Sequence, residues 1–335
     1  MRTPALTEPV KLADVAALAR VSVATASKAL NDRSGVSEAT RDRVRKAAAS
    51  LSYEASVPGR PRQGSFMVGV IVAMLDSHWV TPIVEGLEEV LPTDMADIFI
   101  CPPANATSGV RIRMESLVAR GADGVVVVAD STNRVPSLAD APVPVVYTYG
   151  PSSGADDASF VPDNVQAGRV VGEHLLARGC RRIAFINGDS GFDAARDRAA
   201  GLAQALGDMP LVSGEPLYGD WSEGWGRRGM RALLESGAEV DAVVVGADRV
   251  ARGVMDILRG SGKQIGQDVA VAGFDNWDEL AMNAWPPLTT VDMNLMDIGR
   301  QAGLELKRRM QGQPGEPGIR VLPVRLVPRE STAVL

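Results

Sequence analysis

The sequence predicts a small all-α head followed by an α/β body of two parallel-sheet subdomains. Three observations predict this division. Short segments with helical spacing of apolar residues occupy the first sixty positions. From Phe66 onward, short β-branched runs alternate with longer amphipathic stretches, which is typical of parallel α/β architecture. The charge also changes sign: residues 1–63 hold 11 Lys or Arg against 6 Asp or Glu, whereas residues 64–335 hold 24 against 35.

Composition excludes several classes of protein. A chain of 335 residues that is 45% hydrophobic and 23% charged forms two or three packed units rather than a disordered polymer. No run approaches the roughly 18 apolar residues of a membrane span, and the first residues lack the apolar core of a signal peptide, so we expect a cytoplasmic protein. With two histidines and two cysteines, Cys101 and Cys180, which we expect to be buried thiols, the sequence predicts no metal site, no cofactor and no catalytic residues.

The head contains three short predicted helices. Apolar residues at helical spacing mark the first, from about Leu12 to Ala19. Ser22 is a good N-cap for a second helix from Val23 to about Leu30, and Ser37 for a third from Glu38 to about Leu51. Because only three residues separate the first two helices, the pattern predicts a helix-turn-helix unit over residues 1–55.

The residues of this head also resemble those of a known family. The stretch LADVAALARVSVATASKALNDRSGVSEATRDRVRKAAASLSYEAS is similar to the DNA-binding head of the lactose-repressor (LacI) family of bacterial transcription regulators. The resemblance is carried by Asp14-Val15-Ala16, Val21-Ser22, Thr25, Ser27, Asn31, Val36-Ser37, Thr40-Arg41 and Tyr53. It implies that the second helix enters the major groove of DNA. On charge alone, a solvated basic surface is an equal alternative.

The predicted DNA contacts follow from groove geometry. A recognition helix presents its first residues to base edges and its flanks to phosphates, so Val23 and Ala24 would face bases. Their short apolar side chains can pack on thymine methyls, which leaves Lys28 as the best candidate to reach a guanine acceptor. Small polar residues match family positions that touch the DNA backbone, although each also fits a cap or surface role: Ser22, Thr25, Ser27, Asn31, Ser37, Thr40 and Tyr53.

The linker over residues 56–65 departs from the family. Members of the family follow the head with a hinge helix that wedges a leucine into the minor groove. Here Pro58, Gly59, Pro61 and Gly64 disfavour a helix, and Arg62 stands where the leucine is expected. Gly59-Arg60-Pro61 is similar to an AT-hook, so Arg60 and Arg62 are predicted to bind a narrow minor groove as an extended arm. A flexible linker with solvated arginines is the alternative.

The body over residues 66–335 shows two similar series of predicted elements. The first alternates the runs 67–75, 83–91, 96–101, 111–120, 124–129 and 144–149. After Asp163, a plausible N-cap, the second series predicts helices over 165–178, 194–206, 223–234 and 249–260 and strands over 182–186, 215–218, 242–246 and 268–274. The late segments 288–292, Leu295 to Met310 and 324–327 are predicted to cross back and tie the halves together. Ligands of open parallel sheets lie beyond the carboxyl ends of the strands, so we expect a site between the halves.

The LacI-family resemblance extends over this body, through ARGCRRIAFING, VAGFDN and WPPLTTVDMNLMDIGRQA. It implies a two-lobed, periplasmic-binding-protein-like sensor of a small molecule that also dimerises. Asp275 and Arg198 match ligand-binding positions of the family, with a mutual ion pair as the alternative. Trp221 stands where the family places an aromatic ring against the ligand, with a core role as the alternative. A sugar, with its hydroxyls and apolar ring faces, suits such groups.

Further candidates depart from the family pattern. Asp248 fits a second hydrogen-bond acceptor, but Ala247 replaces an asparagine common in the family. Tyr149 occupies a position where an acidic residue often lies, and Trp79 matches an aromatic that can close the cleft. Packing roles are equal alternatives for these three. The two histidines, His78 and His174, are predicted to fill surface or packing roles.

The sequence therefore predicts a homodimeric, sequence-specific DNA-binding regulator. It is expected to repress carbohydrate genes, with a sugar or sugar derivative in the cleft controlling its affinity for operator DNA. Some family members are instead activated by a corepressor or a partner protein. Two other classes compete: an enzyme, although the chain lacks nucleotide-loop and nucleophile-elbow motifs, and a transport-type binding protein, which the basic head disfavours.

Overall fold

The computed structural model describes residues 12–30, 36–51, 65–72, 74, 77–102 and 109–333. The chain divides into two compact units, Met1–Gly64 and Ser65–Leu335, and each is described by itself. The predicted linker and the residues Asn31, Tyr53, Arg60 and Arg62 lie outside the described residues, as do the side chains of Ala24 and Ser27.

The first unit packs three helices around a core of small apolar side chains. They are α1 (Leu12–Ala19), α2 (Val23–Leu30) and α3 (Glu38–Ser50). The predicted caps are confirmed: the Ser22 hydroxyl accepts the Thr25 N–H at 3.1 Å, and the Ser37 hydroxyl accepts the Thr40 N–H at 3.4 Å. The core is built from Val15, Ala16, Ala19, Ala26, Ala29, Val44, Ala47 and Ala48. These alanines let the helices approach closely, which suits a unit this small.

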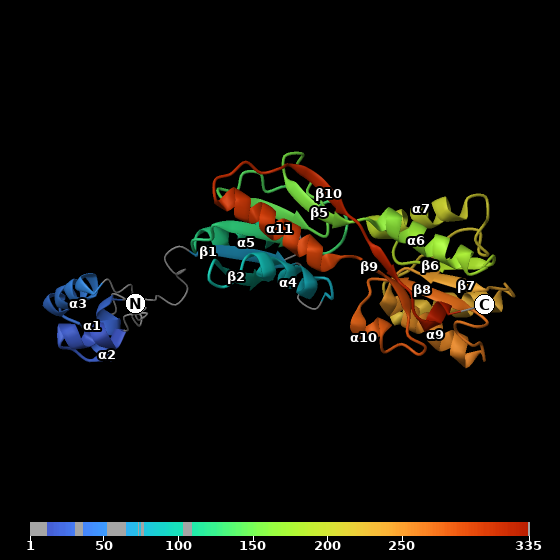
Figure 1. Ribbon diagram of the computed structural model, residues 1–335, viewed down its shortest axis with the longest axis horizontal. Helices are drawn as coiled ribbons and strands as arrows, with labels where there is room; N and C mark the ends of the chain where they lie inside the picture. The colour runs from blue at the N-terminus through green and yellow to red at the C-terminus, as the bar shows by residue number, and fades with distance from the viewer. Residues whose placement is uncertain are drawn as a thin grey trace, which may run out of the picture. The chain divides into compact units, whose positions relative to one another are not determined.

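The second unit contains two sheets (Figure 1). The first has six parallel strands in the order β10-β5-β4-β3-β1-β2, with β1 Phe66–Val72, β2 Ala96–Cys101, β3 Gly124–Val128, β4 Val145–Thr148, β5 Ala158–Pro162 and β10 Gly318–Leu322. The second has the order β11-β9-β8-β7-β6, with β6 Ile183–Ile186, β7 Ala242–Val245, β8 Ala270–Phe274, β9 Thr289–Asp292 and β11 Arg325–Val327. Only β11 among these strands runs antiparallel to its neighbour.

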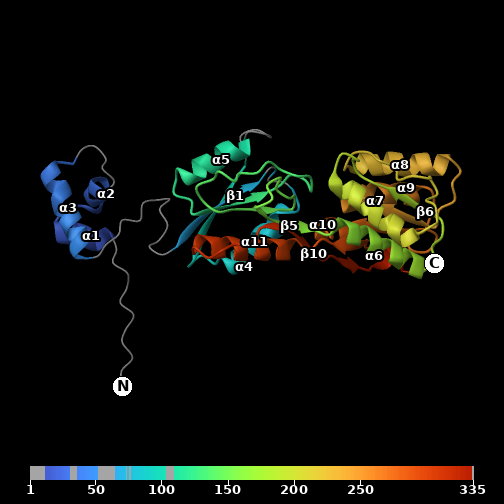
Figure 2. The same cartoon turned by 90° about the horizontal axis from the view of Figure 1, so that it is seen from above.

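Helices cover both faces of each sheet and define two lobes (Figure 2). Lobe 1 has α5 (Gly109–Val118) on one face and α4 (Val80–Val90) and α11 (Leu295–Met310) on the other. Lobe 2 has α8 (Glu223–Glu235) and α9 (Asp248–Gly260) on one face and α6 (Asn164–Ala177) and α7 (Asp193–Leu206) on the other. A short helix, α10 (Asp278–Ala281), follows β8, and a 3-10 turn spans Glu330–Thr332. Double coverage explains why the central strands are buried on both faces.

Three crossings of the described chain join the lobes, as the late segments predict. They lie between β5 and α6, between β9 and α11, and between β10 and β11. Asp163 caps α6 as predicted, since its carboxylate accepts the Gln166 N–H at 2.8 Å. Its own N–H donates to the Leu322 carbonyl at 3.0 Å, and the Asn294 side chain donates to the Pro323 carbonyl at 3.2 Å. The crossings therefore run side by side and form a hinge between the lobes.

Several predicted elements differ from the structure. The segment 215–218, predicted as a strand, forms only a single bridge between Leu217 and Ile186. Strands β5 and β10 have no counterpart in the predicted series. Cys180 is buried as predicted, and burial raises the pKa of its thiol to about 11. Cys101, at the end of the edge strand β2, is partly exposed, because an edge strand lacks a neighbour on one side. In the part of the chain that is described, no helix is long and apolar enough to span a bilayer.

Glycines set the distance between the two helices that support the site in lobe 2. Helices α6 and α7 touch through Gly168 and Gly201. A Cβ atom on Gly201 would lie 1.8 Å from the Val165 carbonyl oxygen, and one on Gly168 would lie 2.0 Å from the Arg198 carbonyl oxygen. Backbone contact at these points fixes where α7 lies, and α7 carries Arg198.

Candidate functional site

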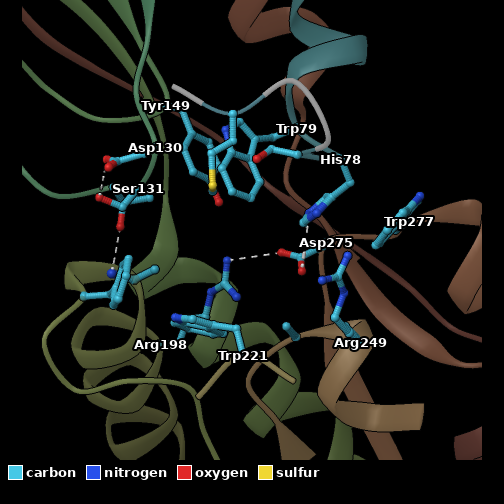
Figure 3. Close-up of a pocket in the computed structure, with 16 residues that line it drawn as sticks. His78, Trp79, Asp130, Ser131, Tyr149, Arg198, Trp221, Arg249, Asp275 and Trp277 are labelled. Atoms are coloured by element: carbon cyan, nitrogen blue, oxygen red, sulfur yellow. Dashed lines mark hydrogen bonds and ion pairs between the residues drawn. The ribbon is translucent and has the colours of Figure 1, made fainter. Parts of the chain in front are cut away.

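A cavity of about 360 Å³ lies between the two lobes, at the carboxyl ends of their parallel strands. Figure 3 shows its side chains converging from both sides. The lining residues come from the segments that follow β1, β3, β4, β6, β7 and β8, from α7 and α9, and from the segment before α8: Met74, Ser77, His78, Trp79, Asp130, Ser131, Thr132, Tyr149, Phe192, Ala194, Arg198, Trp221, Ala247, Arg249, Asp275 and Trp277. The location is the one that parallel-sheet topology predicts.

Arg198 and Asp275 form the polar centre of the cavity. Their side chains lie 3.4 Å apart, from the Arg198 Nη2 to the Asp275 Oδ1, and both are buried. Arg198 also donates to the Asn164 side-chain oxygen at 2.9 Å and to the Gly246 carbonyl at 2.6 Å. Asp275 has a φ of 105°, a conformation that costs energy for a residue with a side chain. The predicted alternative, a mutual ion pair, is therefore present, and both residues also line the cavity, while ligand contact stays a prediction.

His78 joins this pair from lobe 1. Its Nε2 lies 3.5 Å from the Asp275 Oδ2, and its ring stacks on Trp277 of lobe 2 with centroids 4.9 Å apart. Burial lowers the pKa of His78, and the charges of Arg198 and Arg249 lower it further against the opposing effect of Asp275. The stacking on Trp277 agrees with the packing role predicted for His78, but the prediction did not place this residue at the cavity. Its position directly before Trp79, in the segment that follows β1, was the signal that could have found it.

Trp79 and Tyr149 form an aromatic wall in lobe 1. Their rings stack with centroids 4.7 Å apart and planes within 7° of parallel. The Trp79 indole N–H donates to the Ala129 carbonyl at 3.1 Å, which fixes the ring. Burial raises the pKa of the Tyr149 hydroxyl well above its ordinary value, so this side chain stays neutral. Where the family pattern has an acidic group, this protein has a neutral, flat surface.

Trp221 lies on the opposite side of the cavity, in lobe 2. Its ring rests on Gly188, where a Cβ atom would lie 2.3 Å from the indole, and meets the Phe192 ring edge-on at 5.8 Å. Its indole nitrogen is the only buried side-chain polar atom among the described residues that lacks a hydrogen-bond partner. Trp221 thus presents an apolar plate whose position is fixed by packing alone.

Asp248 does not line the cavity, in contrast to the other five residues predicted to bind a ligand. It is fully buried at the start of α9, where its carboxyl group accepts hydrogen bonds from the Thr290 hydroxyl at 2.6 Å and the Trp277 N–H at 3.0 Å. Burial, together with the nearby Asp275 charge, raises its pKa well above the ordinary value. Asp248 therefore supports the segment that carries Trp277 from beneath.

Besides His78, seven lining residues with polar or aromatic side chains were not among the predicted site residues: Ser77, Asp130, Ser131, Thr132, Phe192, Arg249 and Trp277. Trp277 and Arg249 interact with each other, since the Arg249 guanidinium lies 5.3 Å from the centre of the Trp277 ring. Asp130 follows β3 and accepts the Ser131 hydroxyl at 3.1 Å. Asp130, Arg249 and Trp277 each lie within five residues of a strand's carboxyl end, so their position relative to the strands was the signal that could have found them. Within the described ranges, no group of three or more His, Cys, Asp or Glu is arranged to hold a metal ion.

In the first unit, the described residues predicted to touch DNA gather at two helix starts. The hydroxyls of Ser22 and Thr25 lie 2.8 Å apart, and those of Ser37 and Thr40 lie 2.9 Å apart. On α2, Val23 is 49% exposed and Lys28 is also exposed, so this helix presents both side chains to solvent. Hydroxyls beside helix N-termini are suited to phosphate oxygens.

Comparison with known proteins gives consistent matches to both units. A model of "Bacterial regulatory proteins, lacI family" matches residues 11–56, and one of "Periplasmic binding protein-like domain" matches residues 172–332. The HTH-type transcriptional regulator CelR of Thermobifida fusca is 31% identical over 332 residues, covering 95% of this chain and 96% of the relative. A structure of a CelR–cellobiose complex aligns with a TM-score of 0.67 at 29% identity, over 96% of this chain and 99% of the other. A lac repressor dimer bound to operator and an anti-inducer aligns with a TM-score of 0.69 at 27% identity, over 97% and 99%.

Proposed function

Since this chain belongs to the LacI family of bacterial regulatory proteins, we propose that it represses carbohydrate genes and that a sugar-like effector in the interlobe cavity controls its operator affinity. The observation that carries the proposal is the composition of the cavity. The Arg198–Asp275 pair can exchange hydrogen bonds with hydroxyls, while Trp79, Tyr149 and Trp221 offer flat apolar surfaces. This combination suits a ring that has polar edges and apolar faces.

We propose that the cavity binds a ligand and does not catalyse a reaction. The similar proteins are transcription regulators, and one of them is described in complex with a sugar. The charged groups at the centre of the cavity satisfy one another, as a rigid binding site requires. A regulator of transcription acts on the chromosome, so we place this protein in the cytoplasm with operator DNA as its partner.

The coupling mechanism follows from the position of the cavity. Because residues of both lobes contact the same ligand, an effector that prefers one interlobe arrangement shifts the population toward it. In a homodimer, such a shift would change the spacing of the two heads and hence their fit to a roughly palindromic operator.

The decisive experiment is a gel shift with DNA from upstream of its own and neighbouring genes, with and without a panel of sugars and sugar phosphates. We expect preferential binding to at least one fragment and a change in affinity with one effector. Equal binding to genomic and random duplex in every effector condition would overturn the proposal. Specific binding that no sugar alters would uphold DNA recognition and refute the sugar effector.

Lys28 offers a test of base recognition by α2. If its amine reaches a guanine acceptor, Lys28→Ala weakens binding to the operator roughly tenfold and relaxes the base preference at one position. Binding to random duplex should change less. Lys263→Ala, an exposed lysine of the body, is the matched control and should leave both affinities unchanged. An equal loss on operator and random DNA would assign Lys28 to phosphate contact. Arg60 and Arg62 are still predicted to contact the minor groove of the operator.

We propose that the protein forms a homodimer, because it has an exposed apolar patch and because the similar lac repressor is described as a dimer. Trp285 is 78% exposed and Met282 is 53% exposed, both in the segment between α10 and β9. Neighbouring large apolar side chains at the surface are typical of an interface, and a tryptophan within one often contributes about 2 kcal/mol. We expect Trp285→Ser to weaken dimerisation roughly 30-fold in analytical ultracentrifugation. The control, Tyr218→Ser, changes another exposed ring and should dimerise like the wild type. If Trp285→Ser also dimerises like the wild type, the interface does not include Trp285.

A further inference from the structure

Helix α7 of lobe 2 begins without a cap from its own lobe. The first N–H groups of a helix have no partner within the helix and need an acceptor from outside. The N-cap residue, Phe192, has no polar side chain and supplies none. By contrast, α6 and α8 are capped by residues of lobe 2 that directly precede them, Asp163 and Ser222.

The missing acceptors come from lobe 1, about sixty residues away in the sequence. The Asn133 side-chain oxygen accepts the Asp193 N–H at 2.7 Å, and the Thr132 hydroxyl accepts the Ala194 N–H at 2.8 Å. The Asn133 side-chain N–H also donates to the Gly191 carbonyl at 3.2 Å. Thr132 and Asn133, which we call the clasp residues, lie in the segment between β3 and β4. Three hydrogen bonds therefore join the lobes at this edge of the cavity.

Lobe 1 holds the clasp residues in place. The Asn133 N–H donates to the Ser131 hydroxyl at 3.4 Å, and Arg134 donates to the Ser152 carbonyl at 3.1 Å. Gly150 packs against the same segment, since a Cβ atom there would lie 2.4 Å from the Ser131 carbonyl oxygen. Because the segment is fixed to lobe 1, it cannot follow α7 when the lobes separate.

We propose that Thr132 and Asn133 form an interlobe clasp that favours the closed cleft and positions α7. Opening the cleft breaks all three hydrogen bonds and leaves the start of α7 uncapped. Arg198 lies one turn further along α7, so the clasp also sets where its guanidinium meets Asp275. Thr132 and Ala194 both line the cavity, and Figure 3 shows the neighbouring Asp130 and Ser131 on the same wall. A ligand in the cavity would therefore contact the clasp directly. This inference does not depend on the identity of the effector.

Hydrogen exchange on the ligand-free full-length protein tests the capping. In a Thr132→Val, Asn133→Ala double variant, we expect the amides of Asp193 and Ala194 to exchange roughly fivefold faster, the change expected for a lost cap. Thr132→Ser keeps the hydroxyl and should exchange like the wild type. Thr132→Val preserves the shape of the side chain, so it serves as a second variant if the double variant folds poorly. Unchanged exchange at both amides would overturn the proposal.

A distance measurement separates a clasp from a merely local cap. Spin labels at Glu115→Cys on α5 and Glu235→Cys on α8, in a Cys101→Ser background, report the spacing of the lobes. The double variant should shift the distance distribution toward longer values. Ser222→Ala, the matched control, removes the cap that α8 receives from its own lobe and should speed exchange at Trp225 without moving the lobes. Faster exchange at α7 with no change in interlobe distance would contradict the proposal.

Discussion

Asp275→Asn is expected to abolish the response to the effector while leaving the fold intact. The substitution keeps the shape of the side chain but removes the charge that faces Arg198 at 3.4 Å and His78 at 3.5 Å. A carboxylate that accepts ligand hydroxyls contributes about 1.5–3 kcal/mol for each hydrogen bond. Two such bonds correspond to a loss of affinity of at least about 100-fold. Isothermal titration calorimetry with the sugar that raises the melting temperature of the wild type measures this loss.

The companion variant, Arg198→Leu, should have the same effect on ligand binding. It also leaves Asp275 with His78 as its remaining ion-pair partner, so some loss of stability is expected and the melting temperature must be recorded. Arg196→Leu is the matched control on the same helix, because its side chain is half exposed and contacts Ser190 and Asp193 outside the cavity. If Asp275→Asn binds the sugar as tightly as the wild type, the pair is structural and the ligand contacts other groups.

Glu305→Ala is expected to destabilise the protein strongly, through lobe 1. Glu305 lies on α11 with 1% of its surface exposed, and its carboxylate accepts the Arg309 Nε–H at 2.7 Å and the Glu316 N–H at 2.9 Å. Arg320 of β10 donates to the same carboxylate at 3.4 Å, which ties α11 to the edge strand. Removing the anion takes the buried carboxylate from Arg309, Arg320 and the Glu316 N–H and leaves the two cations with their contacts to Glu316, at a cost of about 3 kcal/mol.

The measurement is the free energy of unfolding from urea titration at neutral pH, with Glu316→Gln as the control. The Glu316 side chain is 68% exposed, and exposed ion pairs contribute less than about 1 kcal/mol. Burial acts to raise the pKa of Glu305, but hydrogen bonds from Arg309 and the Glu316 N–H and the charges of Arg309 and Arg320 outweigh it, and the pKa lies below the ordinary 4.5. The stabilisation is therefore fully present above about pH 4.5 and is lost as the pH falls through the folded-state pKa.

Because the folded-state pKa of Glu305 is lowered, the stability of a Glu305→Gln variant relative to the wild type should depend on pH in a definite direction. Its deficit relative to the wild type should be constant between about pH 6 and 8 and should shrink below about pH 4.5, as the wild-type carboxylate takes up a proton. An equal deficit at pH 7 and pH 4 would show that packing, and not charge, is responsible.

Local pattern was sufficient for most of the helices and for the central strands. The predicted helix from Leu295 to Met310 has the same bounds as α11, and the predicted run 96–101 has the bounds of β2. The segment Ala158–Pro162 was missed because a five-residue strand between loops carries little signal of its own and forms through its neighbours, β4 and β10. Segment 215–218 has strand composition, but only Leu217 finds a partner.

The cavity residues were likewise predicted only in part. Family resemblance singled out Arg198, Trp221 and Asp275, which line it, and also Asp248, which lies beneath its floor. Nothing in the local sequence of Asp248 distinguishes a ligand contact from a buried support, because both use a carboxyl group at the start of a helix. The distinction depends on Thr290 and the Trp277 N–H, which arrive from β9 and from the segment after β8.

The sequence by itself determined a basic three-helix head, a parallel α/β body and the crossings between its halves. Charge distribution, helix caps and the spacing of apolar residues were sufficient, because each depends on residues close together in the chain. Tertiary structure alone decided that His78 meets Asp275 and Trp277, and that Thr132 and Asn133 cap a helix of the other lobe. Those contacts join residues about 60 to 200 positions apart, and their geometry is set by how two sheets pack rather than by any pattern within one segment.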